Sequence, residues 1–529
     1  MTLNEYIKSK NDIKLSDSQS EAINKISDFL TSDTPCFILK GFAGTGKTFI
    51  TAQIAQYLDS INYGVKVLTP TGRSAKVAGD KLELAPKFDQ YGNEDHIAQT
   101  IHRGIYKFDT VDEEEEGYDK PIFKLAENSI NKEMIYFIDE ASMLSDKDNN
   151  QDIEFGSGKL LQDLIKFSNI DNRDCESSVK IIFIGDSAQL TPVNMSYSPA
   201  LDAKYLKKQY NLDSDEYELT NIFRQDLKSG ILHNATRLRE DISKKQWYDL
   251  KFDFDQYEDI EELDSNIVDK YINMYNVDDF DDSIFITYST ANANKYNYEI
   301  RKKLFEIESE DKEVVNKERL ICIENNYDQG IFNGEFLIVK RLIGAPIKIT
   351  RWIHARSEAV RTLYKDKLKV LENENRTDSK TGKLIERAPI EVKFQKAEIE
   401  CHDSRGKIIS KELWLNTTIL CTDDRTLTPI QRQALSFTFP PDYDPEKDDK
   451  PLLVKYGYSV VGHKAQGGEW NKAMIDFDTT IGKNCEDYFR WCYTVTTRAK
   501  EKNFFINIPE SVNEREKEKH THLDMLLSR

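Results

Sequence analysis

The sequence lacks several features that would have marked particular classes of protein. Its seven cysteines stand apart without a CxxC pair, so neither a disulfide framework nor a zinc site is expected. No apolar run approaches the roughly 18 residues that a membrane span needs, and residues 1–10 contain no apolar signal region. We therefore expect a cytoplasmic protein with reduced thiols and no membrane partner.

A basic excess is also missing. The formal net charge is −19, which argues against a protein that covers nucleic acid with its whole surface. Much of the acidity is concentrated in residues 112–116 and 253–282, so other faces remain free to form a basic groove. The length of 529 residues, with 39% hydrophobic and 31% charged residues, predicts a soluble globular chain of about two to four domains.

The clearest pattern present is a glycine-rich loop between an apolar strand and a helix. Residues 41–48 have the sequence Gly-Phe-Ala-Gly-Thr-Gly-Lys-Thr. The glycines let backbone N–H groups turn inward around phosphate oxygens, Lys47 can reach the β- and γ-phosphates, and the Thr48 hydroxyl can ligate Mg²⁺. The loop predicts a nucleoside triphosphate site with Mg²⁺ as cofactor. Its binding residues are Gly41, Ala43, Gly44, Thr45, Gly46, Lys47 and Thr48.

Two further apolar strands deliver polar groups at their carboxyl ends, where open α/β sheets place their chemistry. Strand 134–138 leads into Asp139 and Glu140. Asp139 would hold Mg²⁺ through water, and Glu140 would orient or deprotonate an attacking water. Strand 180–184 leads toward Gln189, which is placed to sense the γ-phosphate. Strands alternating with helices up to about residue 200 predict a parallel α/β domain.

Two other segments allow more than one interpretation. Gln19 precedes a helical pattern upstream of the glycine-rich loop; its amide can recognise the N6/N7 edge of adenine, or it can be a solvated helix residue. The segment Thr69-Pro70-Thr71 ends a strand just before a helix. Its hydroxyls and the helix N-terminus could hold a DNA phosphate, or the hydroxyls could only cap the helix.

The second half of the chain contains another α/β region with an insertion. Strand 283–290 runs into a helix, and α/β character returns after residue 458. Between about residues 318 and 450 the alternation breaks, and we expect a basic amphipathic helix at 351–371. That helix could face DNA or could only be solvated. Its cations are Arg351, Arg356, Arg361, Lys365, Lys367 and Lys369.

The order of these motifs, from Gln19 to Arg498, resembles that of the superfamily 1 helicases, and within them the RecD-like and Dda-type branch. Gln19 is similar to the Q motif, residues 41–48 to the Walker A loop, and Asp139-Glu140 to motif II. The other matching segments are 69–71 (motif Ia), 100–102 (motif Ib), 185–189 (motif III), 223–225 (one arginine finger), 463–469 (motif V) and 495–500 (motif VI, with the second finger).

The resemblance implies roles for individual residues. It implies ATP as the nucleotide, adenine recognition by Gln19, and nucleotide contacts from Gly467 and Glu469. Phe123 resembles the position of a wedge at the fork. The implied catalytic residues are Lys47, Glu140, Gln189, Arg224 and Arg498. The implied DNA-binding residues are Thr69, Pro70, Thr71, Thr100, His102, Phe123, Thr287, His463 and Lys464.

The implied fold is α/β, with two RecA-like parallel-sheet motor domains, a β-hairpin insertion (1B) and an SH3-like β insertion (2B). We expect the 1B hairpin to separate the strands of a duplex. The expected domains are 1A (residues 1–103 and 131–203), the 1B hairpin (104–130), 2A (204–317 and 453–529), and 2B with the basic helix (318–452).

The implied activity is that of an ATP-dependent DNA helicase. A monomeric motor would translocate 5′-to-3′ on single-stranded DNA and unwind duplex DNA at a fork, in replication, repair or recombination. A protein-displacing translocase, an RNA-directed helicase and an inactive subunit that uses ATP as a switch are the alternatives. The presence of Lys47, Glu140, Arg224 and Arg498 argues against inactivity. The sequence does not identify a protein partner.

Overall fold

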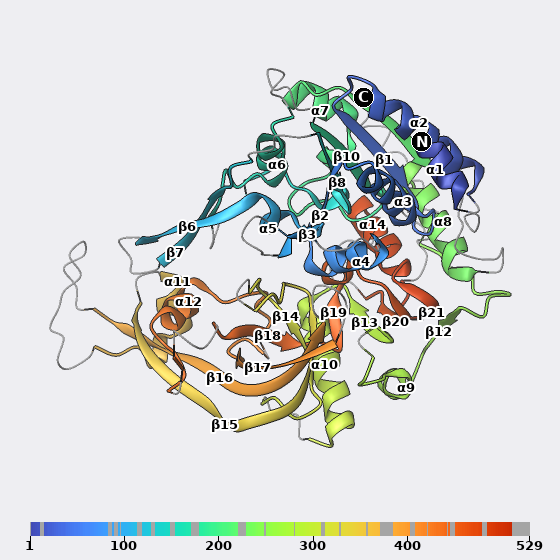
Figure 1. Cartoon of the computed structure of the whole chain (residues 1–529). Helices are drawn as coiled ribbons and strands as arrows, with labels where there is room; N and C mark the ends of the chain where they lie inside the picture. Colours follow the sequence, from blue (N-terminus) through green and yellow to red (C-terminus); the bar gives the residue numbers. More distant parts are fainter. Residues whose placement is uncertain are drawn as a thin grey trace, which may run out of the picture.

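The apolar strands of the first half form a parallel sheet, core 1, in the computed structural model (Figure 1). Side chains alternate along each strand, so that Phe37 and Leu39 face one hydrophobic cluster while Cys36 and Ile38 face another. The strands in their order across the sheet are β11 (Ser214–Leu219), β1 (Cys36–Gly41), β10 (Val179–Gly185), β8 (Met134–Ile138), β2 (Gly64–Thr69) and β5 (Ala98–Thr100).

The structure describes the chain with gaps, and the descriptions below apply to its described residues. These residues are 2–10, 15–82, 87–88, 94–95, 97–113, 119–128, 133–148, 154–170, 179–220, 229–247, 250–279, 281–307, 313–326, 329–355, 358–370, 385–402, 408–420, 422–441, 443–444, 450–478 and 484–509.

Helices cover both faces of core 1. The cluster around Phe37 includes side chains of α1 (Leu3–Ser9), α2 (Asp17–Thr31), α3 (Lys47–Ser60) and α4 (Gly72–Leu82). The cluster around Cys36 includes side chains of α5 (Ile101–Ile105), α6 (Leu160–Ser168), α7 (Ala203–Tyr210) and the short helices η1 (Ala141–Met143) and η2 (Pro199–Leu201). Because β11 pairs in parallel with β1, core 1 extends to residue 219, and the expected boundary at residue 203 lies too early.

A β-hairpin projects from core 1, as expected for residues 104–130 (Figure 1). Strand β6 (Tyr106–Glu113) pairs antiparallel with β7 (Asp119–Leu125), and β9 (Glu154–Phe155) pairs in parallel with β7. A small separate pair is formed by β3 (Lys87–Phe88) and β4 (Glu94–Asp95).

A second parallel sheet, core 2, is built from the later strands, so the two parallel sheets of the expected fold class are confirmed. In order across the sheet its strands are β12 (Ile260–Glu262), β21 (Ala499–Ile506), β20 (Trp470–Asp476), β13 (Ser283–Thr287) and β19 (Ser459–Val461). Its helices are α8 (Gly230–Ser243), α9 (Ile267–Met274), α10 (Thr290–Phe305), α13 (Gly462–Ala465) and α14 (Glu486–Thr496).

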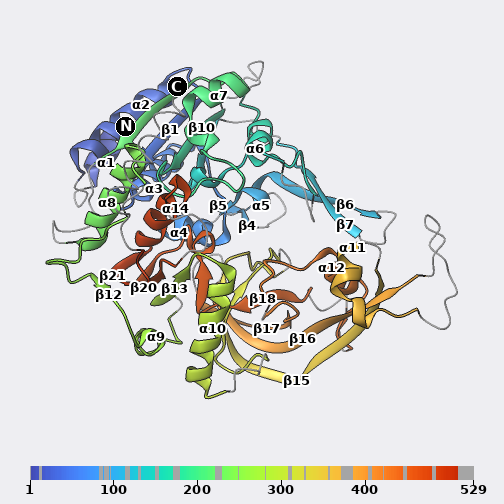
Figure 2. The same cartoon turned by 180° about the vertical axis from the view of Figure 1, so that it is seen from behind.

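The insertion in core 2 is a closed β-barrel, seen from behind in Figure 2 as the lower part of the molecule. The expected 2B boundary at residue 453 falls inside its last strand. The barrel strands are β14 (Arg319–Cys322), β15 (Phe336–His354), β16 (Arg387–His402), β17 (Ile408–Asn416) and β18 (Leu452–Tyr456).

The prediction of a basic helix at residues 351–371 is wrong. Arg351 lies in β15, where Ile347 and Ile349 alternate with polar residues and pair with β16. Helical structure is limited to α11 (Glu358–Leu363) and η3 (Lys365–Lys367) within the described part of this segment. Together with α12 (Pro429–Ser436), α11 packs at the outer end of β15 and β16. The alternation of β-branched and polar residues decided the outcome, because it lets one face of β15 be buried in the cluster that includes α11 and α12.

A buried ion pair fastens the barrel to core 2. Arg301 of α10 donates to both carboxylate oxygens of Glu318, which precedes β14, at 2.8–2.9 Å, and both side chains are at most 1% exposed. The Tyr458 hydroxyl donates to the same carboxylate at 3.0 Å. The barrel is therefore fixed to core 2 by contacts from which water is excluded.

No helix among the described residues is long and apolar enough to cross a bilayer.

Candidate nucleotide site between the two cores

The glycine-rich loop joins β1 to α3, as predicted. Gly46 has a φ of 85° and directly precedes the first residue of α3. A Cβ atom on Gly46 would lie 2.5 Å from Nε2 of Gln19. Glycine is therefore required there both by the left-handed backbone and by the close approach of Gln19.

Gln19 supports the loop from α2. Its Oε1 accepts from the Ser16 N–H at 3.0 Å, and its Nε2 donates to the Thr45 carbonyl at 3.0 Å. The first contact belongs to a capping box in which the Ser16 hydroxyl accepts from the Gln19 N–H. Gln19 is only 2% exposed and borders the cavity described next. Its adenine role stays a prediction, and its structural role is to hold the phosphate loop.

Both cores line one cavity of about 920 Å³ beside the phosphate loop. Among the predicted site residues, core 1 contributes Gln19, Ala43, Gly44, Gly46, Lys47, Thr48, Asp139, Glu140 and Gln189 to its wall, and core 2 contributes Gly467, Glu469 and Arg498. Gly41 ends β1 beneath the loop, and Thr45 is buried with its hydroxyl donating to the Phe42 carbonyl at 2.8 Å. Arg224 lies outside the described residues.

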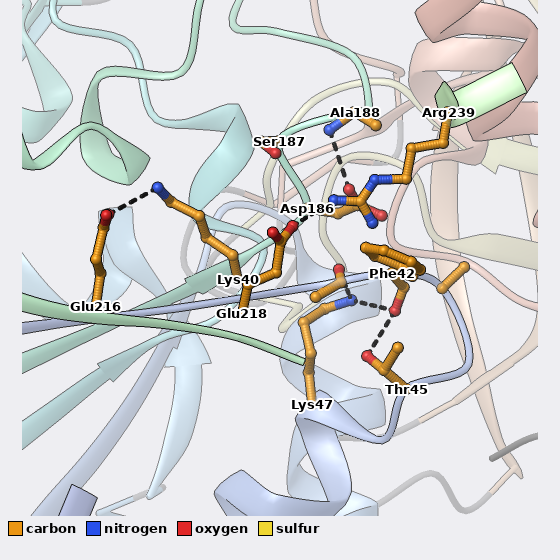
Figure 3. A network of polar contacts seen from close by, with 12 residues as sticks. Lys40, Phe42, Thr45, Lys47, Asp186, Ser187, Ala188, Glu216, Glu218 and Arg239 are labelled. Carbon is orange, nitrogen blue, oxygen red and sulfur yellow. Dashed lines mark hydrogen bonds and ion pairs between the residues drawn. The ribbon is translucent and has the colours of Figure 1, made fainter. Parts of the chain in front are cut away.

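Lys47 folds back on the loop in this structure. Its Nζ donates to the carbonyls of Gly41 and Phe42 at 2.8 and 2.9 Å (Figure 3). The ammonium group is thus held inside the loop by neutral carbonyl oxygens. A phosphate group would be a stronger partner for this cation, because charged hydrogen bonds exceed neutral ones in strength.

The two carboxylates after β8 lie at the cavity wall with raised pKa values. Burial raises the pKa of Asp139, whose Oδ1 accepts from the Glu140 N–H at 2.9 Å. Glu140 has a left-handed backbone with a φ of 53°. Burial, with the nearby charge of Asp139, raises the pKa of Glu140 to about 7, although the charges of Arg498 and Lys47 act in the opposite direction. A carboxyl group with such a pKa can gain and lose protons near neutral pH, as a general base must.

The donor set at this wall suits Mg²⁺. The Thr48 hydroxyl and the Asp139 carboxylate line the same cavity, and oxygen ligands completed by phosphate and water are the ones that Mg²⁺ prefers. No group of three or more His, Cys, Asp or Glu side chains that could hold a metal ion occurs among the residues that the structure describes. An all-protein metal site is therefore not formed there, and the fit is that of a cation shared with a nucleotide.

Arg498 approaches from core 2, two residues after the end of α14. Its Nε donates to the Thr494 carbonyl at 2.8 Å, Nη1 to the Gly468 carbonyl at 3.2 Å, and Nη2 to the Thr497 hydroxyl at 2.9 Å. The side chain is 5% exposed and its charge acts on Glu140. Arg498 therefore supplies a fixed positive charge to the cavity from the side opposite the phosphate loop.

A second arginine of core 2 reaches the phosphate loop, and sequence reasoning missed it. Arg239 of α8 lies over the Phe42 ring at 3.3 Å from its centroid and pairs with Glu218 of β11 at 2.5 Å (Figure 3). Arg239 belongs to an ordinary amphipathic helix, so no local pattern marks it. Its contacts add a cation–π interaction and an ion pair between the cores.

The hydroxyls predicted to bind DNA lie at adjacent strand ends. Thr69 ends β2 opposite Thr100 of β5, and Thr287 ends β13 opposite Val461 of β19. Thr69, Thr100 and Thr287 are buried and bonded to nearby backbone groups, with the Thr100 hydroxyl accepting from the Arg103 N–H. These side chains therefore shape the loops, and DNA contact by them stays a prediction.

The segment after β2 forms the start of α4. Pro70 is half-buried, and the Thr71 hydroxyl accepts from the Ser74 N–H at 3.2 Å, which is the capping interaction. Gly467 comes close to this turn from core 2, since a Cβ on it would lie 3.3 Å from the Thr71 hydroxyl. The segments that resemble motifs Ia and V therefore meet at the interface of the two cores.

The predicted contact residues His102 and Phe123 both pack against Phe155 near the base of the hairpin. The His102 ring lies 4.9 Å from that of Phe155, and Phe123 stacks on Phe155 at 4.8 Å with an interplanar angle of 23°. Burial lowers the pKa of His102 to about 4, so its ring is neutral near pH 7. The geometry of Phe123 is that of a half-buried packing residue, and its wedge role stays a prediction.

The two basic residues of α13 differ in their surroundings. His463 is exposed, whereas Lys464 is partly buried and its Nζ donates to the Asn333 side chain of the barrel. Burial lowers the pKa of Lys464 to about 8. His463 is thus available to a ligand, and Lys464 links core 2 to the turn before β15.

The chain is similar to known proteins in sequence. Residues 14–155 match the family described as AAA domain. An uncharacterized protein of Acanthamoeba polyphaga mimivirus is 23% identical over 545 residues, which covers 92% of this chain and 99% of the relative. An uncharacterized protein of Methanocaldococcus jannaschii is 25% identical over 487 residues, which covers 89% of this chain and only 36% of that relative's length.

Solved structures of helicases are also similar to this chain. The Pif1 helicase from Bacteroides in complex with ADP-AlF3 and single-stranded DNA is 16% identical, with a TM-score of 0.44 and coverage of 97% of both chains. The Pif1 helicase from Candida albicans is 14% identical, with a TM-score of 0.45 and coverage of 97% of this chain and 99% of that chain.

The fold and the site define a class, a P-loop nucleotide-binding protein with two parallel cores around one cavity. The AAA domain match spans the phosphate loop and the carboxylates of Asp139 and Glu140. The family match therefore agrees with the P-loop nucleotide site that the sequence predicts.

Proposed function

We propose that this protein is an ATP-dependent DNA helicase that moves 5′-to-3′ on single-stranded DNA and separates duplex strands. The observation that carries the proposal is the shared cavity, in which Lys47, Asp139 and Glu140 of core 1 face Arg498 of core 2. The polarity, the DNA preference and the identity of Arg224 as a second arginine finger come from the family resemblance alone.

The placement of charges explains how hydrolysis would be coupled to movement. Lys47 and the loop N–H groups would hold the phosphates, Glu140 would take a proton from the attacking water, and Arg498 would stabilise charge on the transferring phosphate. Mg²⁺, when bound near Thr48 and Asp139, would neutralise charge on phosphate oxygens. Because these groups come from both cores, their full effect requires the cores to fit together, and the nucleotide state therefore biases how the cores are arranged.

A track for a single strand is supported by the repeated arrangement of the two sheets. In each core, a strand ends in a buried threonine and leads into a longer helix, α4 after Thr69 and α10 after Thr287. Helix N-termini with free N–H groups bind phosphates without reading the bases. Alternating grips by the two cores would move the protein along the strand.

A strand-displacement assay tests the proposal. We expect ATP-dependent unwinding of DNA duplexes with a 5′ single-stranded tail, little on duplexes with only a 3′ tail or on RNA, and ATPase activity that single-stranded DNA stimulates. Lys47→Ala and Glu140→Gln should abolish both activities, while Lys40→Ala, which changes an exposed pair with Glu216 on the neighbouring strand, should not.

Each other outcome would reject one part of the proposal. A preference for the 3′ tail would reject the polarity, and unwinding of RNA duplexes would favour the RNA-directed alternative. DNA-stimulated ATPase without unwinding would favour a protein-displacing translocase. Near wild-type turnover in folded Lys47→Ala or Glu140→Gln would reject the assigned site.

A further inference from the structure

One face of α14 joins core 2 to the loop that follows β10 in core 1. Arg490 donates to the carbonyls of Ser187 and Gln189, and the Thr494 hydroxyl accepts from the Leu190 N–H at 3.1 Å. Tyr493 lies between these two residues on the same face. The segment 186–190 is thus held by three successive contacts from one helix of the opposite core.

Tyr493 makes the most buried of these contacts. Its hydroxyl donates to Oδ2 of Asp186 at 2.5 Å and accepts from the Ala43 N–H of the phosphate loop at 3.2 Å. The side chain is 1% exposed. The other carboxylate oxygen of Asp186 accepts from the Ala188 N–H at 3.0 Å (Figure 3). One phenol therefore connects the phosphate loop, the segment after β10 and the helix of the other core.

The same helix positions the arginine of the site. The Thr494 carbonyl accepts from Nε of Arg498, and Thr494 is the residue directly after Tyr493. On the core 1 side, Asp186 begins the segment that leads to Gln189, which lines the cavity. The hydroxyl of Tyr493 thus sits between the element that holds Arg498 and the segment that carries Gln189, without lining the cavity itself.

We propose that Tyr493 is a positioning residue for ATP hydrolysis, whose hydroxyl sets the phosphate loop and Asp186 in register with the helix that holds Arg498. The proposal rests on the proposed function, since it concerns the same site. It predicts that loss of the hydroxyl slows turnover more than it weakens ATP binding, because Gln19, the loop glycines and Lys47 remain in place on core 1.

Tyr493→Phe removes the hydroxyl and keeps the ring. The Ala43 N–H, which borders the cavity, and one oxygen of the buried Asp186 carboxylate then lose a partner. If the loop moves to replace these bonds, kcat is expected to fall by about tenfold to a hundredfold. The KM for ATP and the affinity for a nonhydrolysable ATP analogue should change by less than about threefold.

The matched control is Tyr488→Phe. Tyr488 lies on the same helix and is equally buried, but its hydroxyl donates to the Phe477 carbonyl within core 2 at 2.6 Å. Both variants remove one buried hydroxyl from α14, so a general loss of stability would affect them alike. Kinetics are measured with and without single-stranded DNA, well below the melting temperature of each variant.

A double variant tests the route. If the hydroxyl acts through Asp186, Tyr493→Phe with Asp186→Asn should be no slower than the slower single variant. Additive losses, an unchanged kcat in Tyr493→Phe, a loss confined to KM, or an equal effect in Tyr488→Phe would each overturn the proposal. A wild-type protein without ATPase activity would instead overturn the proposed function, so the two failures are distinguishable.

Discussion

Glu140 shows at the scale of a single residue how the fold prepares a catalytic group. Glu140 lies just after a fully buried strand and next to Asp139, and its backbone is left-handed. Removal from water and the neighbouring negative charge both favour its protonated form, which outweighs the attraction of Arg498 and Lys47. A left-handed backbone at a residue other than glycine is a feature of functional sites, and so is a raised carboxyl pKa.

The raised pKa predicts how activity depends on pH. The pKa of Glu140 is about 7, so the carboxyl becomes protonated as the pH falls through 7 and can then no longer accept a proton from water. We expect kcat/KM for ATP to fall by about tenfold per pH unit well below that value. Steady-state kinetics between pH 5.5 and 8.5, at about half-unit steps, measure it.

The control for the pH profile is Glu133→Gln, which changes an exposed carboxylate just before the same strand. It should keep the wild-type profile, whereas Glu140→Gln should have little activity at any pH. A wild-type kcat/KM that stays constant between about pH 6 and 8 would show that another group accepts the proton.

Arg498 allows a second prediction at this scale. Because its guanidinium reaches the cavity from core 2, Arg498→Ala should reduce kcat by up to about 10³-fold, with a smaller loss of ATP affinity. Lys502→Ala is the control, since that side chain pairs with Glu261 on the edge strand of core 2. Binding and hydrolysis are measured separately, and a loss confined to binding would contradict the finger role.

At the scale of elements, the sequence predicted correctly those elements whose structure depends on residues close together in the chain. The phosphate loop and the strand before Asp139 each depend on neighbouring residues, and the structure places them as expected. The prediction of a helix at 351–371 was wrong. The cations of this segment are compatible with a helix, but its structure is set by pairing with β16, including Arg351 with Ile390. Pairing partners distant in sequence are not visible in a local pattern.

The hairpin of β6 and β7 allows a prediction about Phe123. Phe123 stacks on Phe155 at the base of the hairpin, so Phe123→Ala should cost about 1–3 kcal/mol of stability and reduce unwinding, translocation and ATPase activity together. Thermal unfolding and the three activities measure it. Phe155→Ala, which removes the other ring of the stack, should behave in the same way.

A different result would support the predicted wedge role of Phe123. If Phe123→Ala keeps its melting temperature and its DNA-stimulated ATPase, but unwinds far more slowly, then the ring acts at the fork as the family resemblance implies. Base stacking on an aromatic ring is worth about 1–3 kcal/mol, which is sufficient for such a selective loss.

At the scale of the whole molecule, the site depends on contacts that no local pattern reveals. The Ala43 N–H and the Tyr493 hydroxyl belong to residues 450 positions apart, and Arg239 meets Phe42 from another core. The resemblance supplied Arg498 because its motif is recognisable on its own. Tyr493 lies five residues earlier and gains its role only from the packing of α14 against core 1.

The barrel and core 2 are expected to unfold as one unit, because the Arg301–Glu318 pair lies between them at full burial. All five tryptophans of the chain belong to core 2 or the barrel: Trp247, Trp352, Trp414, Trp470 and Trp491. Intrinsic tryptophan fluorescence therefore reports the unfolding of this unit with no contribution from tryptophan in core 1.

Arg301→Leu leaves the Glu318 carboxylate buried without its cation, so we expect a loss of about 3–5 kcal/mol in the unfolding free energy of this unit. In the double variant Arg301→Leu with Glu318→Leu, no charge remains buried, and most of that loss should be recovered. Lys303→Leu lies on the same helix as Arg301 and breaks an exposed pair with Asp269 of α9; it should change stability by less than about 1 kcal/mol. Denaturant titrations followed by tryptophan fluorescence measure all three variants. If the double variant were as unstable as Arg301→Leu alone, the loss would come from packing of the arginine side chain against Tyr456, 3.9 Å from its ring centroid, and not from the unpaired charge.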